Sequence, residues 1–336
     1  MKSIVVVDDL QTGDIKPAEL IGQYIGMLRA DLRTFFLETG ELREANCPAC
    51  ASSVRRGGFE RYGLQYRECA DCGTLYVSPR PSDEAIVRFY REAPSRSFWS
   101  QKLSEATRQK RSEKIIKPRI EWVADSYAEH CPRAKRWIDL HASQMRYVEA
   151  MAGTKNSLQK IVVSPYFDGN VETPTGVVLD AAGWRTFSQT DADIVTVFEL
   201  LDQTSDADGL MGRVNGALKR GGLCFITVIL ASGFDVKTLG ARAENIYPPD
   251  RMNVFSVKGL KTLLEKSGFE LLEFSTPGVL DVDIVENALK ADPDIEVSPF
   301  IRDLVLNQSD EVRGAFQAFL QANLLSSYGR VLIRKK

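Results

Sequence analysis

The chain has 336 residues, with 44% hydrophobic and 26% charged side chains and a formal net charge of −2. This length allows two domains or one large domain with additions, and the composition is that of ordinary globular proteins. The slightly negative charge argues against a dedicated nucleic-acid-binding protein. No apolar run reaches the length of a membrane span, and the short apolar stretch in Met1–Leu10 ends in two aspartates, unlike a secretory signal. We therefore expect a cytoplasmic protein with no nucleic-acid and no membrane partner.

Residues 1–45 predict an N-terminal helical segment. Apolar side chains recur every three or four residues from Leu20 to Leu32, and Pro17 stands where a helix would begin. A helix is therefore expected within residues 16–45.

Four cysteines define the next module, residues 46–80. Cys47, Cys50, Cys69 and Cys72 form two Cys-x2-Cys pairs that are separated by eighteen residues. Two such pairs can close a tetrahedral Zn²⁺ site with four thiolate ligands and no open position. The spacing predicts a structural zinc ribbon with these four ligands. The alternatives are two disulfides or four unrelated core cysteines.

A helical connector rich in basic residues is predicted over residues 81–130. Between Arg55 and Arg119 the sequence contains fifteen Lys and Arg against eight Asp and Glu, and seven of these cations lie within residues 102–119. This cluster favours a solvated helix face. Alternatively, it forms a surface for a protein partner or for an anionic small molecule.

In residues 131–336 short apolar strands alternate with helices. The predicted strands are 137–140, 160–163, 176–179, 193–198, 223–228, 269–274 and 329–333, and the predicted helices include 143–151, 206–219 and 257–267. This alternation predicts an α/β fold, in which a parallel sheet is covered by helices on both faces. A helical insertion is expected at about residues 280–325.

Three stretches of this region resemble the class I S-adenosylmethionine-dependent methyltransferases. They are Asp193–Gln203, Leu218–Val228 with its Lys-x-Gly-Gly turn, and Lys258–Phe269. The resemblance implies a Rossmann-like methyltransferase sheet in residues 131–336 and S-adenosylmethionine as the cofactor. The zinc module followed by Tyr76–Ser82 resembles a subgroup with an N-terminal zinc-binding module that is often associated with sugar and glycan modification. This second resemblance implies a small-molecule or glycan acceptor.

The resemblance also implies where the cofactor would bind. Family members have a glycine-rich turn after the first strand, because the cofactor packs against bare backbone there. In this chain His141, Ser143 and Met145 occupy the three glycine positions, and Ser164 stands where an acidic residue would bind the ribose. The implied cofactor-binding residues are Asp139, His141, Ser143, Met145, Ser164 and Phe198.

The catalytic base cannot be one of the family's histidines, because Gln203 and Arg251 occupy their positions. A group that deprotonates an acceptor hydroxyl would be one of Glu199, Asp202, Tyr247 or Asp250. Each of these also has an ordinary interpretation as a strand-end or packing residue.

A substrate-facing surface is expected at the carboxyl edge of the sheet, where open α/β folds bind ligands. The residues expected there are Tyr90, Arg91, Trp99, Tyr247, Arg251 and Asn253. Tyr90 and Trp99 fit a hydrophobic seam between the connector and the main domain equally well.

Two functions from different classes are consistent with these patterns. The first is a zinc-containing, S-adenosylmethionine-dependent methyltransferase that acts on a sugar or glycan precursor. The second is a non-catalytic methyltransferase-fold scaffold or partner subunit, which has lost the cofactor because side chains fill the glycine positions.

Overall fold

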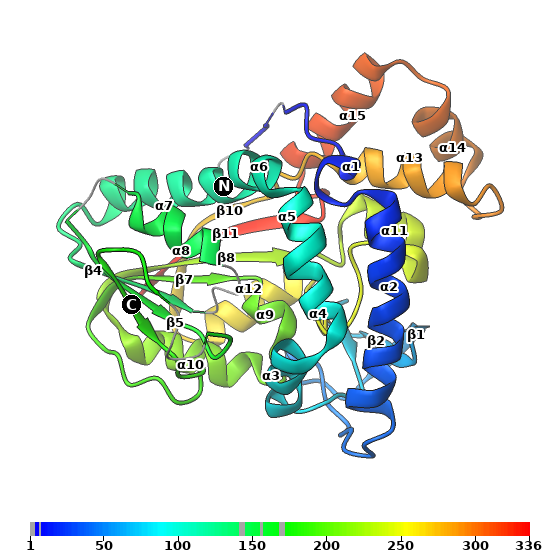
Figure 1. Ribbon diagram of the computed structural model, residues 1–336. Helices are drawn as coiled ribbons and strands as arrows, with labels where there is room; N and C mark the ends of the chain where they lie inside the picture. The colour runs from blue at the N-terminus through cyan, green and yellow to red at the C-terminus, as the bar shows by residue number, and fades with distance from the viewer. Residues whose placement is uncertain (1–3, 7, 141–144, 155–156, 168–171) are drawn as a thin grey trace.

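The computed structural model describes residues 4–6, 8–140, 145–154, 157–167 and 172–336, and its main element is a seven-stranded sheet (Figure 1). The strand order is β10-β11-β8-β7-β4-β5-β6. The strands are β4 (Arg136–Leu140), β5 (Gln159–Val163), β6 (Val177–Asp180), β7 (Ala192–Phe198), β8 (Leu218–Ile229), β10 (Phe269–Ser275) and β11 (Tyr328–Lys335). All seven strands predicted from the sequence are present, with ends that differ by a few residues.

The sheet is mixed, whereas the alternating pattern predicted a parallel sheet. Neighbouring strands from β6 to β8 pair in parallel, but β11 runs antiparallel to both β8 and β10. The physical reason lies in the helices α13 (Asp281–Ala291), α14 (Pro299–Leu306) and α15 (Asp310–Ala322). They stay together beyond one end of the sheet (Figure 1), so the chain re-enters at the end where β8 finishes, and Tyr328 pairs with Ile229. This order, with its one reversed strand, is the class I methyltransferase topology that the resemblance predicted.

Helices cover both faces of this sheet. On one face α10 (Ala207–Ala217) and α12 (Val257–Lys266) pack against Ile138, Val195 and Ile226. On the other face α7 (Lys117–His130) and α8 (Met145–Ala152) pack against the residues that alternate with them, such as Trp137, Ile194 and Phe225. Because side chains along a strand point to opposite faces in turn, these apolar strands are buried on both sides.

A second, four-stranded antiparallel sheet contains the cysteines. Its order is β1-β2-β3-β9, with β1 (Arg55–Arg61), β2 (Leu64–Cys69), β3 (Leu75–Val77) and β9 (Asn253–Val254). Strand β9 comes from the loop after β8, so the small sheet is completed by the large domain. A side chain on Gly259 in α12 would collide with Thr74, because the helix packs directly on the second cysteine turn.

The N-terminal segment and the connector are helical, as predicted. They contain α1 (Thr12–Ile15), α2 (Ala18–Leu32), α3 (Asp83–Glu92), α4 (Pro94–Phe98), α5 (Ser104–Ala106) and α6 (Arg108–Arg111), with π-helical turns at Arg33–Leu37, Trp99–Leu103 and Ser112–Ile116. Two short helices, α9 (Leu200–Gln203) and α11 (Phe234–Leu239), lie in loops after β7 and β8, and a 3₁₀ turn follows at Gly240–Arg242. The first long helix ends at Leu37 rather than near residue 45, because Gly40 adopts a left-handed conformation with φ of 69°. No helix in the described part of the chain is both long and apolar enough to span a membrane.

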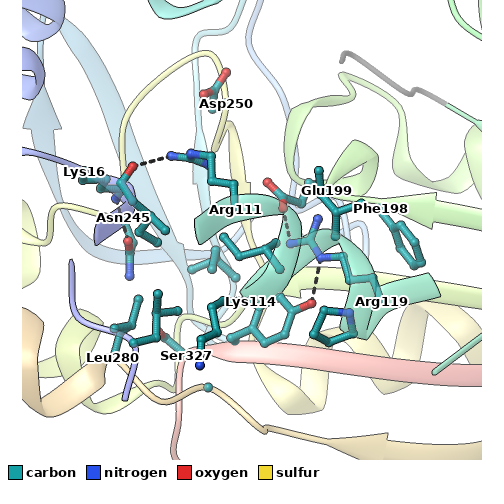
Figure 2. Close-up of a pocket in the computed structure, with 18 of the residues that line it drawn as sticks. Lys16, Arg111, Lys114, Arg119, Phe198, Glu199, Asn245, Asp250, Leu280 and Ser327 are labelled. Carbon is teal, nitrogen blue, oxygen red and sulfur yellow. Dashed lines mark hydrogen bonds and ion pairs between the residues drawn. The ribbon is translucent and has the colours of Figure 1, made fainter. Parts of the chain in front are cut away.

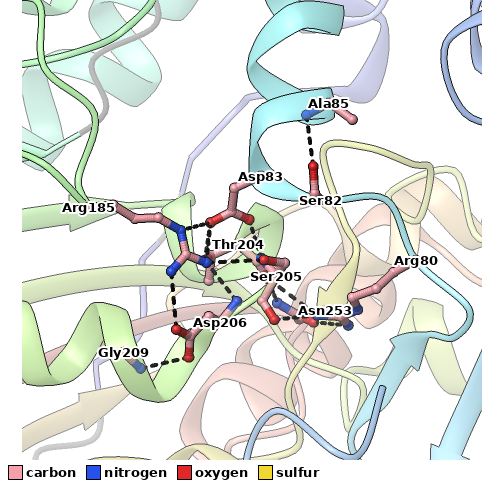
Figure 3. Close-up of polar contacts among 10 residues, drawn as sticks. All are labelled: Arg80, Ser82, Asp83, Ala85, Arg185, Thr204, Ser205, Asp206, Gly209 and Asn253. Carbon is pink, nitrogen blue, oxygen red and sulfur yellow. Dashed lines mark hydrogen bonds and ion pairs between the residues drawn. The ribbon is translucent and has the colours of Figure 1, made fainter. Parts of the chain in front are cut away.

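Arg80 joins the cysteine-bearing sheet to the large domain (Figure 3). Its guanidinium is 4% exposed and donates to the carbonyl of Val77 at 2.9 Å, to that of Ser205 at 3.3 Å and to Asn253 Oδ1 at 2.6 Å. The amide of Asn253 donates in turn to the carbonyls of Leu201 and Thr204, each at 2.8 Å. One planar cation therefore connects β3, β9 and the end of α9.

We predict that Arg80→Met lowers the free energy of unfolding by about 2–4 kcal/mol, because several buried acceptors lose their donor. Urea unfolding monitored by circular dichroism measures this loss. Arg43→Met is the matched control: its side chain is exposed, so it should change stability by less than about 0.5 kcal/mol. Equal stability of the two variants would contradict the role assigned to Arg80.

Candidate active site

A cavity of about 420 Å³ lies at the carboxyl edge of the large sheet (Figure 2). It is lined by the ends of β4, β7 and β8, by the N-terminal segment and by the connector. The chain places β5 and β6 on one side of β4 and places β7 and β8 on the other, so the strand order reverses between β4 and β7. Open α/β sheets bind ligands at such a switch point, which makes this cavity the candidate active site.

Glu199 occupies the centre of this edge, directly after β7. Its two carboxylate oxygens accept from Arg119 at 2.5 Å and from Arg251 at 2.7 Å. Burial opposes ionisation, but the charges of Arg119 and Arg251 outweigh it and hold the pKa of Glu199 well below its ordinary value. An ionised carboxylate held by two guanidinium groups is a weak proton acceptor. The contacts assign Glu199 to positioning these two arginines.

The backbone of Glu199 is strained in the same place. Its φ of 61° lies in the left-handed region, which residues with a side chain seldom adopt. Such a conformation persists only where surrounding contacts enforce it, and strained residues are common at functional sites. Here the two arginine contacts supply the constraint.

Asp202 and Tyr247, two further candidate bases, are buried. Asp202 is fully buried, accepts from the backbone N–H of Ile229 at 3.1 Å and lies 3.4 Å from Arg251, but it does not line the cavity. Burial raises the pKa of Asp202 well above its ordinary value. Tyr247 does line the cavity, and burial raises its pKa well above the ordinary value too, so its hydroxyl keeps its proton. Both groups suit hydrogen bonding better than proton abstraction.

Asp250 is the fourth candidate base, and it lines the cavity. Its Oδ1 accepts from the hydroxyl of Tyr90 and lies 3.6 Å from Arg96. Arg96 in turn stacks over Tyr90 at 4.4 Å and over Trp99 at 5.7 Å from the ring centroids. Asp250 therefore lines the cavity and, unlike Glu199, is not held by two arginine hydrogen bonds.

Lys16 lines the cavity and was not predicted from the sequence as a site residue. Its Nζ donates to Asn245 Oδ1 at 2.9 Å and lies 5.7 Å from the centroid of the Tyr247 ring. Burial is the main cause that lowers the pKa of Lys16 to about 8, and the positive charges of Arg251 and Arg111 lower it further.

The basic cluster at residues 102–119 divides between solvent and the cavity. Lys102, Arg108 and Lys117 are exposed, but Arg111 and Arg119 line the cavity. Lys114 lines it as well and pairs with Asp8 and Asp9 of the N-terminal segment. A signal was present in the sequence, because these three residues recur at helical spacing. However, it could not show that a π-helical turn and the N-terminal segment direct them inward.

Four of the six residues expected at a substrate-facing surface line this cavity. Tyr90, Trp99, Tyr247 and Arg251 line it, whereas Arg91 and Asn253 do not. Arg91 donates to the carbonyl of Pro165, and Asn253 belongs to the junction around Arg80. Tyr90 and Trp99 also pack in the apolar core beneath the connector, so both interpretations of these rings apply.

The predicted cofactor-binding residues separate into three groups. Asp139 and Phe198 line the cavity, whereas Met145 and Ser164 do not. Met145 begins α8 and packs beside the core on that face of the sheet. His141 and Ser143 lie outside the described residues.

S-Adenosylmethionine, which the fold implies, would lie in the part of the cavity between the ends of β4 and β7. Asp139, Leu140 and Phe198 line that part, and the volume is within the range of small-molecule sites. At the end of β5, where the ribose would be held, Ser164 is fully buried. Asp139 is 2% exposed and accepts from Thr196 at 2.5 Å, so its main contact supports the end of β4.

The four predicted metal ligands lie together, and their geometry suits a metal ion. The sulfur atoms of Cys47, Cys50, Cys69 and Cys72 all lie within 4.8 Å of one another. The sulfur atoms of Cys47 and Cys72 are 3.5 Å apart, and so are those of Cys50 and Cys69. This distance is far longer than a disulfide bond and close to the edge length of a tetrahedron of thiolates around zinc. The disulfide alternative is therefore excluded in this structure. The cluster lies away from the cavity and offers no open position.

A family model described as a methyltransferase domain matches residues 115–273, slightly less than half of the chain. No curated protein sequence matches the chain. Together with the sheet topology, the matched model shows a class I methyltransferase fold. This segment contains β4 to β8, the end of β7 at Glu199 and the loop that carries Asp250.

Several solved structures are similar to this chain. The putative sarcosine dimethylglycine methyltransferase from Galdieria sulphuraria is 15% identical with a TM-score of 0.42, over 70% of this chain and 88% of that one. The plantazolicin methyltransferase BpumL in complex with S-adenosylhomocysteine is 10% identical with a TM-score of 0.45, over 75% and 94%. An O-methyltransferase from a trans-AT PKS multienzyme of Brevibacillus brevis, with the same ligand, is 11% identical with a TM-score of 0.45, over 74% and 79%. These values are too low to transfer a substrate or a catalytic residue to this chain.

We predict that Glu199→Gln destabilises the protein by about 1–3 kcal/mol at pH 7, because two buried arginines lose their charged partner. The pKa of Glu199 is lowered by folding, so its stabilising contribution is present above the unfolded-state pKa of about 4.3 and is lost as the pH falls below that value. The difference between wild type and variant should therefore shrink between pH 5 and pH 3, as measured by urea unfolding at each pH. A difference that is independent of pH would contradict the ion pairs.

Proposed function

We propose that this protein is a methyltransferase that uses S-adenosylmethionine and binds its acceptor in the cavity at the carboxyl edge. The observation that carries the proposal is the position of this cavity at the switch point between β4 and β7, two strands of the matched methyltransferase domain. The cofactor supplies a methyl group on a sulfonium, which a nucleophilic acceptor atom attacks as it loses its proton. The cavity is lined by Asp139 and Leu140 at the end of β4 and by Asp250 in the loop after β8, so in this proposal the cofactor and the acceptor would share it.

Residues of the chain perform the remaining tasks in this proposal. Glu199 orients Arg119 and Arg251, and Tyr247 donates a hydrogen bond to the acceptor. Asp250 accepts the acceptor's proton, because among the predicted bases it is the carboxylate that lines the cavity and is not held by two arginines. General bases of this kind contribute about 10²- to 10⁴-fold to a rate.

The sugar or glycan nature of the acceptor is a further part of the proposal. It is supported by the resemblance of residues 46–82 to the zinc-bearing subgroup, and the polar lining of the cavity by Tyr, Asp, Asn and Arg side chains suits a hydroxylated ligand. The alternative, a scaffold that has lost the cofactor, rests on Ser164 and on the substituted glycine positions. Ligand binding separates the two.

We predict that the folded protein binds S-adenosylmethionine and S-adenosylhomocysteine in calorimetry, and that it transfers a labelled methyl group to an acceptor from a panel of sugars and nucleotide sugars. Asp250→Asn should lower kcat by about 10²- to 10⁴-fold and leave the affinity for S-adenosylhomocysteine unchanged. Asp294→Asn, an exposed position outside the cavity, is the matched control. Absence of binding of both ligands at millimolar concentration would overturn the proposed activity and favour the scaffold.

We further propose that the four cysteines bind Zn²⁺ as a structural ion. Four thiolates in two Cys-x2-Cys turns are the ligand set that zinc prefers in closed sites. The second turn supports α12 through Gly259, and Ser256 donates to the carbonyl of Cys72. Zinc at this position would therefore stabilise the contact between the small sheet and the large domain.

We predict that the purified protein contains one equivalent of zinc, and that Cys47→Ser releases it and lowers the melting temperature, because metal binding contributes directly to folding. Atomic emission spectroscopy and thermal unfolding measure the two effects. Cys131→Ser, which removes a cysteine outside the cluster, should retain the metal. Full zinc content in the Cys47 variant would refute this ligand set.

A further inference from the structure

The cavity contains more positive than negative charge along its wall. Seven cationic side chains line it: Lys16, Arg96, Arg111, Lys114, Arg119, Arg251 and Arg330. Five carboxylates line it: Asp8, Asp139, Glu199, Asp250 and Asp281. Two of these carboxylates, Asp139 and Asp281, are each only 2% exposed and already accept from neighbouring hydroxyl or amide groups.

Some of these cations are neutralised by the protein itself. Arg96 faces Asp250, Arg119 faces Glu199, and Lys114 faces Asp8. Arg251 shares Glu199 with Arg119, and its other acidic neighbour, Asp202, favours the neutral form because it is buried.

Lys16 and Arg111 have only neutral hydrogen-bond partners among the described residues, although the charges of Glu244 and Asp235 act on Lys16 and that of Glu199 acts on Arg111. Lys16 donates to Asn245 Oδ1 at 2.9 Å and to the carbonyl of Glu244 at 3.4 Å. Arg111 donates to the carbonyl of Ile15 at 2.6 Å and to Thr107 Oγ1 at 2.9 Å, and no ion pair joins it to a described carboxylate (Figure 2). The guanidinium of Arg111 lies 5.2 Å from the centroid of the Trp99 ring.

These cations also act on one another. Burial is the main cause that lowers the pKa of Lys16; the charge of Glu244 opposes it, and the charges of Arg251 and Arg111 lower the pKa further, so each of these guanidinium groups is close enough to repel the ammonium. Burial likewise lowers the pKa of Arg111. Cations that are removed from water without a counter-ion cost free energy, and an anion that binds between them would recover part of it.

We propose that Lys16, Arg111 and Arg251 form a subsite for an anionic group, a carboxylate or a phosphate, on the methyl acceptor. This inference rests on the proposed methyl transfer. Two planar guanidinium groups and an ammonium provide the donors that carboxylates and phosphates require. Tyr247, which lies beside Lys16 in the cavity, adds a neutral hydroxyl donor.

The position of the subsite favours the acceptor over the cofactor as the source of the anion. Lys16 and Arg111 lie on one side of the cavity and Phe198 on the other (Figure 2). The cofactor would lie at the ends of β4 and β7, near Asp139 and Phe198, where the fold places it. The carboxylate of the cofactor's methionine part is the other possible source, and the experiment distinguishes the two.

The test uses inorganic phosphate as the probe on the full-length, zinc-loaded protein, with and without saturating S-adenosylhomocysteine. Calorimetry gives the affinity, and the fluorescence difference between wild type and Trp99→Phe reports occupancy beside Arg111. Lys16→Met and Arg111→Gln should each weaken phosphate binding by about tenfold or more, since each removes a charge-assisted hydrogen bond. Arg220→Gln, an exposed arginine outside the cavity, should bind as wild type does.

Two results together would support an acceptor subsite. Phosphate would still bind when S-adenosylhomocysteine is bound, and Lys16→Met would bind S-adenosylhomocysteine with unchanged affinity. Competition between the two ligands would assign the cations to the cofactor's carboxylate and overturn the proposal. An equal loss in Arg220→Gln, or no loss in Lys16→Met, would overturn it as well. Phosphate binding without any S-adenosylhomocysteine binding would support the anion subsite while refuting the proposed methyl transfer, so the two failures are distinguishable.

Discussion

The contact between Glu199 and its two arginines is the interaction on which the candidate site depends. One carboxylate at the end of β7 holds Arg119 from the connector helix α7 and Arg251 from the loop before β9. These three segments are far apart in the sequence, and they meet where the strand order of the sheet reverses. The left-handed backbone of Glu199 is tolerated because both oxygens of its carboxylate are held by arginines.

The cysteine-bearing sheet is part of the same construction. Its fourth strand, β9, follows directly after the loop that carries Asp250 and Arg251. Arg80 binds Asn253 at the start of β9, so the position of that loop is set partly by the small sheet. The cysteine turns are therefore connected to the cavity, because they belong to the small sheet whose strand β9 continues from the cavity loop.

The lining of the cavity has more positive than negative side chains, and this excess bears on which ligand could bind there. The protein neutralises Arg96 and Arg119 with its own carboxylates, but it leaves Lys16 and Arg111 with neutral oxygen partners. Within a buried site that arrangement is costly unless a ligand provides the missing negative charge. We propose that these groups select an anionic ligand, whose charge would offset this cost.

Local patterns in the sequence determined much of this protein. The spacing of the cysteines predicted the cluster around Cys72, and the apolar runs predicted every strand of the large sheet, because ligand spacing and side-chain period are properties of short segments. Only the tertiary structure decided three features: the antiparallel direction of β11, the pairing of β9 with the small sheet, and the orientation of Lys16 and Arg111 toward the cavity. Each of them depends on contacts between segments that are distant in the chain, and a one-dimensional pattern carries no information on which face of one segment another will cover.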